Sequence, residues 1–414
     1  MTRAEEQTRK WKGKAVARST RVGWWAIALL AILPYAAACG GSGGSEGPKT
    51  RTVSRTQHAD FDSIQKCISA SKNQDTCLVY PGTYRERIRF QGKAITIRSS
   101  DGPEKTIIDG REQGPVVTLE NGEDRHSVLQ GFTITNGLAV SGEDSVEHGA
   151  GIQLLSAGPT IQDCILLDNH AEGDGGGIYC FSTGSKPDIE NVVFQGNTAG
   201  GQGGALCAVY GGADVVNSLF IENEASVGGA ISSRYGAPLG LSNCTFQGNS
   251  ASTQASALYL LNTISAWTNS ICFFNASPSG STVVLDLDPQ QAGKTSLALS
   301  HVDLEGGTGE IGRTQPCSAQ PGSCSLQSDG MLDADPLFVP LSLEAPSEIP
   351  WQAFYLSQPA TLRGDQVQLG TSPCVDAGDR SAEEAGLEER TTRTDGIPDE
   401  GIVDLGYHYA LPAS

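Results

Sequence analysis

The chain of 414 residues contains few basic and few aromatic residues. Lysine and arginine number 28 against 47 acidic residues, which gives a formal net charge of −19, and 6% of residues are aromatic. No basic stripe is present to neutralise the phosphates of nucleic acid, so nucleic-acid binding is excluded. The six histidines show no paired metal-binding spacing, and there is no C-x-x-C pair. Serine-hydrolase, Walker and dinucleotide-binding signatures are also missing.

Long hydrophobic runs are lacking as well. The apolar stretch 24–33 is too short to span a bilayer, and it follows a basic segment, as in a signal peptide. The sequence AAAC at 36–39 allows two interpretations. It resembles a bacterial lipobox, which predicts a lipoprotein signal peptide at 1–38 and lipid attachment at Cys39. The alternative is an ordinary signal peptidase site after A-x-A, with Cys39 incidental. We favour lipidation.

The segment after Cys39 predicts how the protein is displayed. GGSGGSEGP at 40–48 has the composition of a flexible linker, so we expect a tether over 39–57. No aspartate follows Cys39, which by resemblance to known lipoproteins favours the outer membrane over the inner membrane. We therefore expect a location in the cell envelope, as an outer-membrane lipoprotein or at the cell surface, with the lipid anchor as the membrane contact.

The body of the chain carries a repeat of about 26 residues. Each copy has a polar residue, five intervening residues and an asparagine. The five copies are Asp163 with Asn169, Asn191 with Asn197, Asn217 with Asn223, Asn243 with Asn249, and Asn269 with Asn275. Such a period is typical of a solenoid, in which each repeat is one coil stacked on the last.

Short apolar segments recur inside each copy. Ile178, Leu206 and Ile231 each follow two or three small residues, and the apolar runs are four to six residues long with turn residues between them. This pattern is typical of strands rather than helices. Coils of two or three strands would stack roughly 4.8 Å apart, so equivalent residues would lie one above another. We interpret the asparagines as internal ladders, because stacked amides pair with one another. The alternatives are exposed turn residues or a ligand-binding row.

Two further motifs alternate along the repeat. FQGN (194–197), FIEN (220–223) and FQGN (246–249) alternate with GGAL (203–206) and GGAI (228–231). They resemble the F-x-x-N and G-G-A-I/L motifs of polymorphic outer-membrane proteins. This resemblance implies an all-β fold, a right-handed parallel β-helix with the architecture of pectate lyases. It is specific for the fold and says little about activity, because one architecture hosts many functions.

The ends of the predicted β-helix differ from its repeats. An amphipathic segment near 61–70, with Asp60 as a candidate N-cap, resembles the helix that caps the first coil of many β-helices. We expect the β-helix with this cap to occupy 58–305. Residues 306–414 contain motifs such as SPCVDAGD (372–379) that resemble segments of secreted bacterial β-helix proteins, and we expect an irregular C-terminal cap laid along the helix.

Ten cysteines remain besides Cys39. Disulfides can form once the chain has crossed the inner membrane. Cys67 with Cys77 and Cys317 with Cys324 are the candidate bridges. The repeat cysteines, including Cys164 and Cys244, are interpreted as buried thiols. We expect no cofactor other than a Ca²⁺ ion in the C-terminal cap. The alternative is that the aspartates there are turn and capping residues that bind no metal. The candidate ligands of the ion are Asp376, Asp379, Asp395, Asp399 and Asp404.

No catalytic set stands out in the sequence. The signatures of polysaccharide-acting β-helix enzymes, such as R-I-K, G-H-G or D-P-H, are missing, and Arg234, Asp174 and His148 are only weak candidates. Aromatic residues are expected mostly at core positions. We therefore expect a monomeric, non-catalytic binding, adhesion or structural module that presents a stacked β face to glycan or protein. The alternative is an enzyme, a polysaccharide lyase or glycoside hydrolase whose residues are not recognisable.

Overall fold

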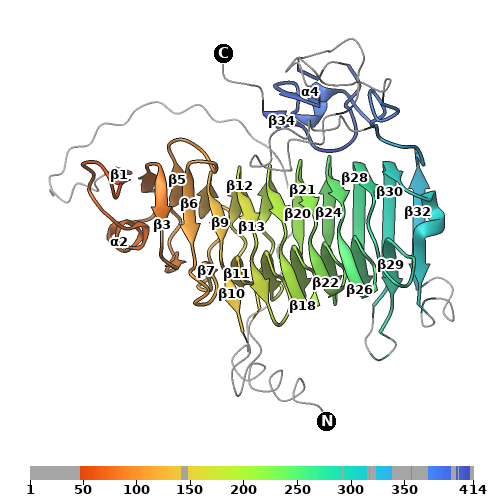
Figure 1. The fold of residues 1–414 in the computed structure, drawn as a ribbon, viewed down its shortest axis with the longest axis horizontal. Helices are drawn as coiled ribbons and strands as arrows, with labels where there is room; N and C mark the ends of the chain where they lie inside the picture. The colour runs from red at the N-terminus through yellow and green to blue at the C-terminus, as the bar shows by residue number, and fades with distance from the viewer. Residues whose placement is uncertain are drawn as a thin grey trace, which may run out of the picture. The chain divides into compact units, whose positions relative to one another are not determined.

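The computed structural model describes residues 47–140, 148–288, 290, 293–314, 317, 323–337, 356, 372–392, 398–399 and 401–410. The predicted signal peptide, the predicted lipidation site Cys39, the first part of the predicted tether and Asp395 lie outside these residues. Within them the chain forms coils of short strands that pair in parallel with the coils before and after (Figure 1). The predicted parallel β-helix is confirmed.

Three parallel sheets run along the stack of described coils. The 18-stranded sheet comprises β1 (Thr50–Val53), β2 (Thr76–Val79), β3 (Gly82–Tyr84), β5 (Thr96–Ser99), β6 (Thr106–Asp109), β8 (Val128–Gln130), β9 (Thr133–Thr135), β12 (Thr160–Gln162), β13 (Ile165–Leu167), β16 (Asp188–Glu190), β17 (Val193–Gln195), β20 (Ala213–Val216), β21 (Leu219–Ile221), β24 (Leu239–Ser242), β25 (Thr245–Gln247), β28 (Ile264–Phe273), β30 (Thr295–Leu304) and β32 (Cys324–Asp329). The nine-stranded sheet comprises β4 (Ile88–Arg89), β7 (Val117–Leu119), β11 (Ile152–Leu155), β15 (Ile178–Phe181), β19 (Leu206–Val209), β23 (Ile231–Arg234), β27 (Leu258–Leu261), β29 (Val283–Asp286) and β31 (Ile311–Arg313). The five-stranded sheet comprises β10 (Leu138–Ala139), β14 (His170–Ala171), β18 (Thr198–Gln202), β22 (Glu224–Val227) and β26 (Ser250–Gln254).

The repeat determines the register of these strands. Phe194 pairs with Phe220 and Phe220 with Phe246, and their rings stack at centroid distances of 4.8 and 4.5 Å. Ile178 and Leu206, which follow the glycine-rich segments, are likewise register partners. All five side chains are buried in the main hydrophobic cluster, so the apolar stripes of the repeat form the interior of the coils.

The second asparagine of each repeat forms a ladder inside the stack. The Asn197 amide nitrogen donates to Asn223 Oδ1 at 3.0 Å, and the Asn223 amide nitrogen donates to Asn249 Oδ1 at 2.9 Å. Each amide also donates to a backbone carbonyl one coil earlier, which for Asn223 is Phe194. Each Oδ1 also accepts a backbone N–H from the preceding asparagine, so a buried rung such as Asn223 has its amide donors and its acceptor paired. Asn169 and Asn275 are the ends of this ladder.

The first polar position of each repeat lies at a turn in the left-handed region, with φ between 46° and 55°. Asn191 donates to Asp163, and Asn217 donates to Asn191 at 2.7 Å. From Asn217 onward these side chains also bond to the C-terminal segment, whose described residues are 356, 372–392, 398–399 and 401–410. Asn243 is 3.5 Å from the carbonyl of Asp404. Asn269 exchanges two bonds with Asp379, at 2.8 and 3.1 Å. Asn217, Asn243 and Asn269 therefore bind the C-terminal segment to the coils, and we call these three residues the docking strip.

The C-terminal segment covers apolar side chains that point outward from the 18-stranded sheet. Tyr407 packs with Ile165, Val193, Leu219 and Ile221, and a neighbouring cluster joins Ile271 and Phe273 to Leu356, Cys374 and Leu405. This segment contains α4 (Ala382–Ala385) and the antiparallel pair β33 (Arg390–Thr391) and β34 (Tyr409–Ala410) (Figure 1). Its described residues contact the 18-stranded sheet of the β-helix.

The strand pairing reaches beyond the predicted boundaries at both ends. β1 lies inside the predicted tether and pairs with β2, while β31 and β32 lie inside the predicted cap and extend two sheets. Helix α2 (Ile64–Ala70) caps the first coil, and η1 (Gly307–Glu310) precedes β31. The N-cap of α2 is Ser63, not Asp60. Ser63 accepts the backbone N–H of Lys66, whereas Asp60 accepts from Thr52.

Both candidate disulfides are present, Cys67 with Cys77 and Cys317 with Cys324, with Cα–Cα distances of 6.1 and 5.3 Å. Free buried thiols are Cys164, Cys180, Cys207, Cys244, Cys272 and Cys374. Among the described residues, no helix combines the length and the apolarity that a membrane crossing requires.

Candidate functional site

The outer face of the nine-stranded sheet carries two rows of stacked side chains. In β15 the side chains of Ile178 and Cys180 enter the core, so those of Tyr179 and Phe181 point outward, as strand alternation requires. Register extends these positions along the sheet. The first outer row contains Arg89, Thr118, Gln153, Tyr179, Cys207, Ser232, Tyr259 and Val284, and the second contains Leu155, Phe181, Val209, Arg234, Leu261 and Asp286.

The three weak catalytic candidates of the sequence come together on this face. Arg234 Nη2 lies 2.6 Å from Asp174 Oδ2, although 60 residues separate them, because two stacked coils bring the turn before β15 beside β23. Asp174 Oδ1 accepts the backbone N–H of Gln202 at 2.8 Å. Gly201 leaves room for this carboxylate, since a Cβ there would be 2.2 Å from Oδ1. The carboxylate is therefore held between two coils.

His148 is the third member of the cluster formed by Asp174, Arg234 and His148. A backbone hydrogen bond determines its tautomer. The backbone N–H of Asp174 donates to His148 Nδ1 at 2.8 Å, so Nδ1 is unprotonated and Nε2 carries the hydrogen. Burial lowers the pKa of His148 and outweighs the charge of Asp174, which raises it, while the charge of Arg234 lowers it further, so the neutral ring is favoured. The ring stacks on Tyr179 at a centroid distance of 4.5 Å. His148 therefore offers a hydrogen-bond donor rather than a free base.

The thiol beside Arg234 is not an activated nucleophile. Arg234 Nη2 lies 3.5 Å from Cys207 Sγ, but burial raises the pKa of Cys207 to about 12. A thiol nucleophile needs a depressed pKa. At the far end of the cluster, Tyr259 donates its hydroxyl to Asp286, which also accepts from Thr314. The polar groups of this face are thus largely paired with one another.

An outward row of aromatic rings borders the cluster. Phe181 meets Tyr210 edge-on at 5.8 Å, and Tyr210 stacks on Tyr235 at 5.5 Å. Phe181 is 40% exposed and Tyr210 is 38% exposed. With Tyr179, which lies 6.1 Å from Phe181, these rings form what we call the aromatic row: Tyr179, Phe181, Tyr210 and Tyr235. Most aromatic residues of the described chain are buried, as expected, and the exposed Phe181 and Tyr210 are exceptions.

A sequence signal for part of the row exists. Tyr210 and Tyr235 each follow an apolar anchor, Leu206 or Ile231, by four residues. Both tyrosines adopt positive φ, 63° and 59°, at the turn that ends the strand. Ser156 and Asn262 occupy the same kind of turn with φ of 60° and 50°. The turn geometry is thus common to the coils, and aromatic residues have been placed on it in two of them.

The candidate calcium ligands are already engaged in hydrogen bonds and ion pairs. Asp379 pairs with Arg380 and Asn269, and Asp399 accepts from the buried His408 at 2.9 Å. Asp404 accepts from Thr392 and from the backbone N–H of Asp376. Burial and the charge of Asp399 raise the pKa of Asp404 to about 6. Within the described part of the chain, no group of three or more histidine, cysteine or acidic side chains is arranged to hold a metal ion.

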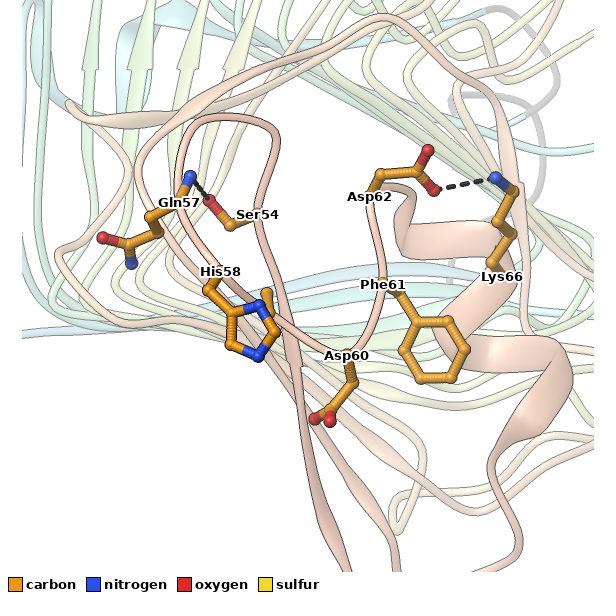
Figure 2. Close-up of a pocket in the computed structure, with 8 residues that line it drawn as sticks. Ser54, Gln57, His58, Asp60, Phe61, Asp62 and Lys66 are labelled. Carbon is orange, nitrogen blue, oxygen red and sulfur yellow. Dashed lines mark hydrogen bonds and ion pairs between the residues drawn. The ribbon is translucent and has the colours of Figure 1, made fainter.

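A separate hollow of about 460 Å³ lies beside the N-terminal cap, lined in part by His58, Asp60 and Phe61. Figure 2 shows these side chains around an open depression, with Asp62 and Lys66 paired at 2.8 Å at its edge. The hollow contains none of the residues of the cluster or of the aromatic row. It is a feature of the cap.

Comparison with known proteins found one matching repeat family and several solved structures. Residues 163–180 and 191–209 match the repeat described as the Chlamydia polymorphic membrane protein repeat. Ybhc of Escherichia coli is 10% identical with a TM-score of 0.39, covering 81% of this chain and 94% of its own. Pectin methylesterase PemA of Erwinia chrysanthemi is 11% identical with a TM-score of 0.36, covering 79% and 99%. Carrot pectin methylesterase is 12% identical with a TM-score of 0.33, covering 70% and 85%.

The identities and TM-scores of these solved structures are too low to support any argument about this chain. The chain has no significant match among curated proteins. The family match covers two of the five copies of the repeat, and the strand register extends the same coil to the others. The protein is a parallel β-helix repeat protein whose coils resemble the chlamydial polymorphic membrane protein repeat.

Proposed function

We propose that this protein is a lipid-anchored β-helix protein of the bacterial cell surface that binds an extended glycan along the outer face of its nine-stranded sheet, without chemical turnover. The aromatic row is the single observation that supports this most strongly. Phe181 and Tyr210 are exposed on neighbouring coils and Tyr235 is half-buried on the next, while Tyr179 is buried beneath the row. The apolar faces of sugar rings pack on exposed aromatic rings of this kind. Tyrosine adds a polar hydroxyl to each ring.

The geometry of the row suits a repetitive ligand. Tyr210 and Tyr235 lie on neighbouring coils with centroids 5.5 Å apart, so their spacing is that of the strands themselves. The backbone at both tyrosines is set by the coil turn, so little freedom is lost when a ligand is bound. Hydrogen-bonding groups lie beside the rings, among them the Nε2–H of His148. A glycan uses both kinds of contact.

The chemistry of the cluster favours binding over catalysis. Arg234 is paired with Asp174, His148 Nδ1 already accepts a backbone hydrogen bond, and the Cys207 thiol is protonated at neutral pH. General-base catalysis needs a group within reach of a substrate proton and free to accept it. The convergence of Asp174, His148 and Arg234 is the one observation that favours the second candidate, a polysaccharide-acting enzyme.

The surface location rests on sequence features. The repeat that matches 163–180 and 191–209 is described as that of a polymorphic membrane protein, and the N-terminal segment ends in AAAC at 36–39. Metabolic labelling with a lipid precursor tests the anchor. The wild-type protein should be labelled and membrane-associated, and Cys39→Ala should lose both properties. An unlabelled wild-type protein would contradict lipidation.

Binding is tested by titrating the purified protein with a panel of soluble neutral and acidic polysaccharides. Tyr210→Ala and Tyr235→Ala should weaken the binding that the wild type shows. Phe274→Ala is the matched control, because Phe274 is 54% exposed and its ring contact is with Phe273, outside the aromatic row. Equal loss in all three variants would contradict a specific track.

A further inference from the structure

A second hollow, of about 430 Å³, opens on the same face as the aromatic row. Its lining includes Arg87, Arg89, Gln113, Thr118 and Gln153. Two arginines and two glutamines thus line the hollow, in a protein whose net charge is −19. The local chemistry is therefore opposite to that of the chain as a whole.

The hollow lies next to the aromatic row in the strand register. Arg89, Thr118, Gln153 and Tyr179 are successive register partners on β4, β7, β11 and β15, so they occupy one outward row. Gln153 Nε2 also donates to the backbone carbonyl of His148 at 3.0 Å, and the His148 ring stacks on Tyr179. A chain lying over the aromatic row therefore reaches this hollow at the N-terminal end of the sheet.

The two arginines differ in how their charge is used. Arg89 forms an ion pair with Glu120, which neutralises it in part. Arg87 is exposed, and no ion pair of Arg87 is found among the described residues. Its guanidinium lies over Gly114, where a Cβ would be 2.5 Å from Nη1. Gly114, with φ of 128°, thus leaves the space that Arg87 uses at the rim of the hollow.

We infer that this hollow binds an anionic substituent of the glycan, a carboxylate, sulfate or phosphate, while the sugar chain continues over the aromatic row. The inference rests on the proposed function. A guanidinium presents several N–H donors in one plane and bonds to such oxyanions through two of them at once. The amides of Gln113 and Gln153 add donors to the remaining oxygens. The ligand is thus an anionic glycan rather than a purely neutral one.

The experiment compares polymers that share one backbone and differ in charge: hydroxyethyl cellulose, carboxymethyl cellulose and cellulose sulfate. The wild type should bind the charged forms at least about tenfold more tightly than the neutral form at low salt, and this preference should shrink as salt screens the contact. Arg87→Ala should remove the preference and leave binding of the neutral polymer unchanged. Arg98→Ala is the matched control, because it removes an exposed arginine on β5 of the 18-stranded sheet.

The outcomes separate this inference from the proposed function. Equal binding of neutral and charged polymers, unaffected by Arg87→Ala but lost in Tyr210→Ala, would overturn the anionic site and keep the glycan track. Binding of none of the polymers would contradict both. Inorganic sulfate alone, if it occupied the site as tightly as cellulose sulfate, would show a free-anion site and overturn the glycan assignment. Arg87→Lys should recover only part of the preference, because an ammonium lacks the planar pair of donors.

Discussion

Asn217 and His408 hold each other by a reciprocal pair of hydrogen bonds, although 191 residues separate them. The backbone N–H of His408 donates to Asn217 Oδ1 at 2.6 Å, and Asn217 Nδ2 donates to the carbonyl of His408 at 2.8 Å. Asn217 Nδ2 also donates to Asn191. One side chain therefore links the stack of coils to the segment that covers it.

We predict that Asn217→Ala loosens the C-terminal segment. The buried backbone groups of His408 lose their partner, which costs roughly 1–3 kcal/mol. Limited proteolysis should cut the variant sooner within 372–410 while the coils stay intact. Asn121→Ala, at an exposed position, should behave as the wild type does. An unchanged cleavage rate in Asn217→Ala would contradict the docking role.

The inner ladder should matter more for global stability. Asn223→Leu leaves the Asn249 oxygen, the Phe194 carbonyl and the Asn197 amide each without one partner inside the stack. At roughly 1–3 kcal/mol for each unpaired buried group, the loss should exceed that of Asn217→Ala. Chemical denaturation measures the free energy of unfolding. A loss no larger than that of the exposed control Asn121→Leu would rule out the ladder as a major stabilising element.

A pH dependence follows from Asp303. Burial raises its pKa to about 6, even though Cys374 and the backbone N–H of Ala334 donate to the carboxylate. A carboxyl group whose pKa is raised on folding contributes stability below its unfolded value near 3.8, and this contribution is lost as pH rises through about 6. The neutral isostere Asp303→Asn should therefore gain stability relative to the wild type between pH 4 and 7. Melting curves at several pH values measure this gap, and a constant gap would contradict the assignment.

Calcium in the C-terminal cap stays a prediction. Asp376, Asp379, Asp399 and Asp404 are near the docking strip, and a cation would relieve the repulsion between the buried Asp399 and Asp404. Millimolar calcium should then raise the melting temperature and a chelator should lower it, since a ligand that binds only the folded state stabilises it by mass action. A melting temperature indifferent to both would leave these aspartates as capping groups only.

The stacked positions of the coils could be predicted because they repeat along the sequence. The Phe194, Phe220 and Phe246 stack follows from a period of about 26 residues, because equivalent positions must lie one above another. The contact between Asn217 and His408 has no period, so nothing in the sequence points to it. The segment 50–53 carries no repeat motif, so the sequence gives no signal for β1, which lies within the predicted tether.

The candidate site was predicted in part. Asp174, His148 and Arg234 were named singly, but their convergence depends on a two-coil separation that only the stacked register reveals. The aromatic row was missed because an aromatic residue at a turn and one in the core both follow short apolar strands. Tyr210 lies at the turn that ends its strand, with a positive φ, and it is 38% exposed.

The central claim is tested most directly by titrating the purified protein with soluble polysaccharides. Calorimetry measures binding, and assays of reducing ends and unsaturated products measure turnover in the same mixtures. Binding without product release, weakened at least about tenfold by Tyr210→Ala and Tyr235→Ala but not by Phe274→Ala, is the predicted result. Product release by the wild type that disappears in Arg234→Ala, Asp174→Ala or His148→Ala would contradict a binding module and establish an enzyme.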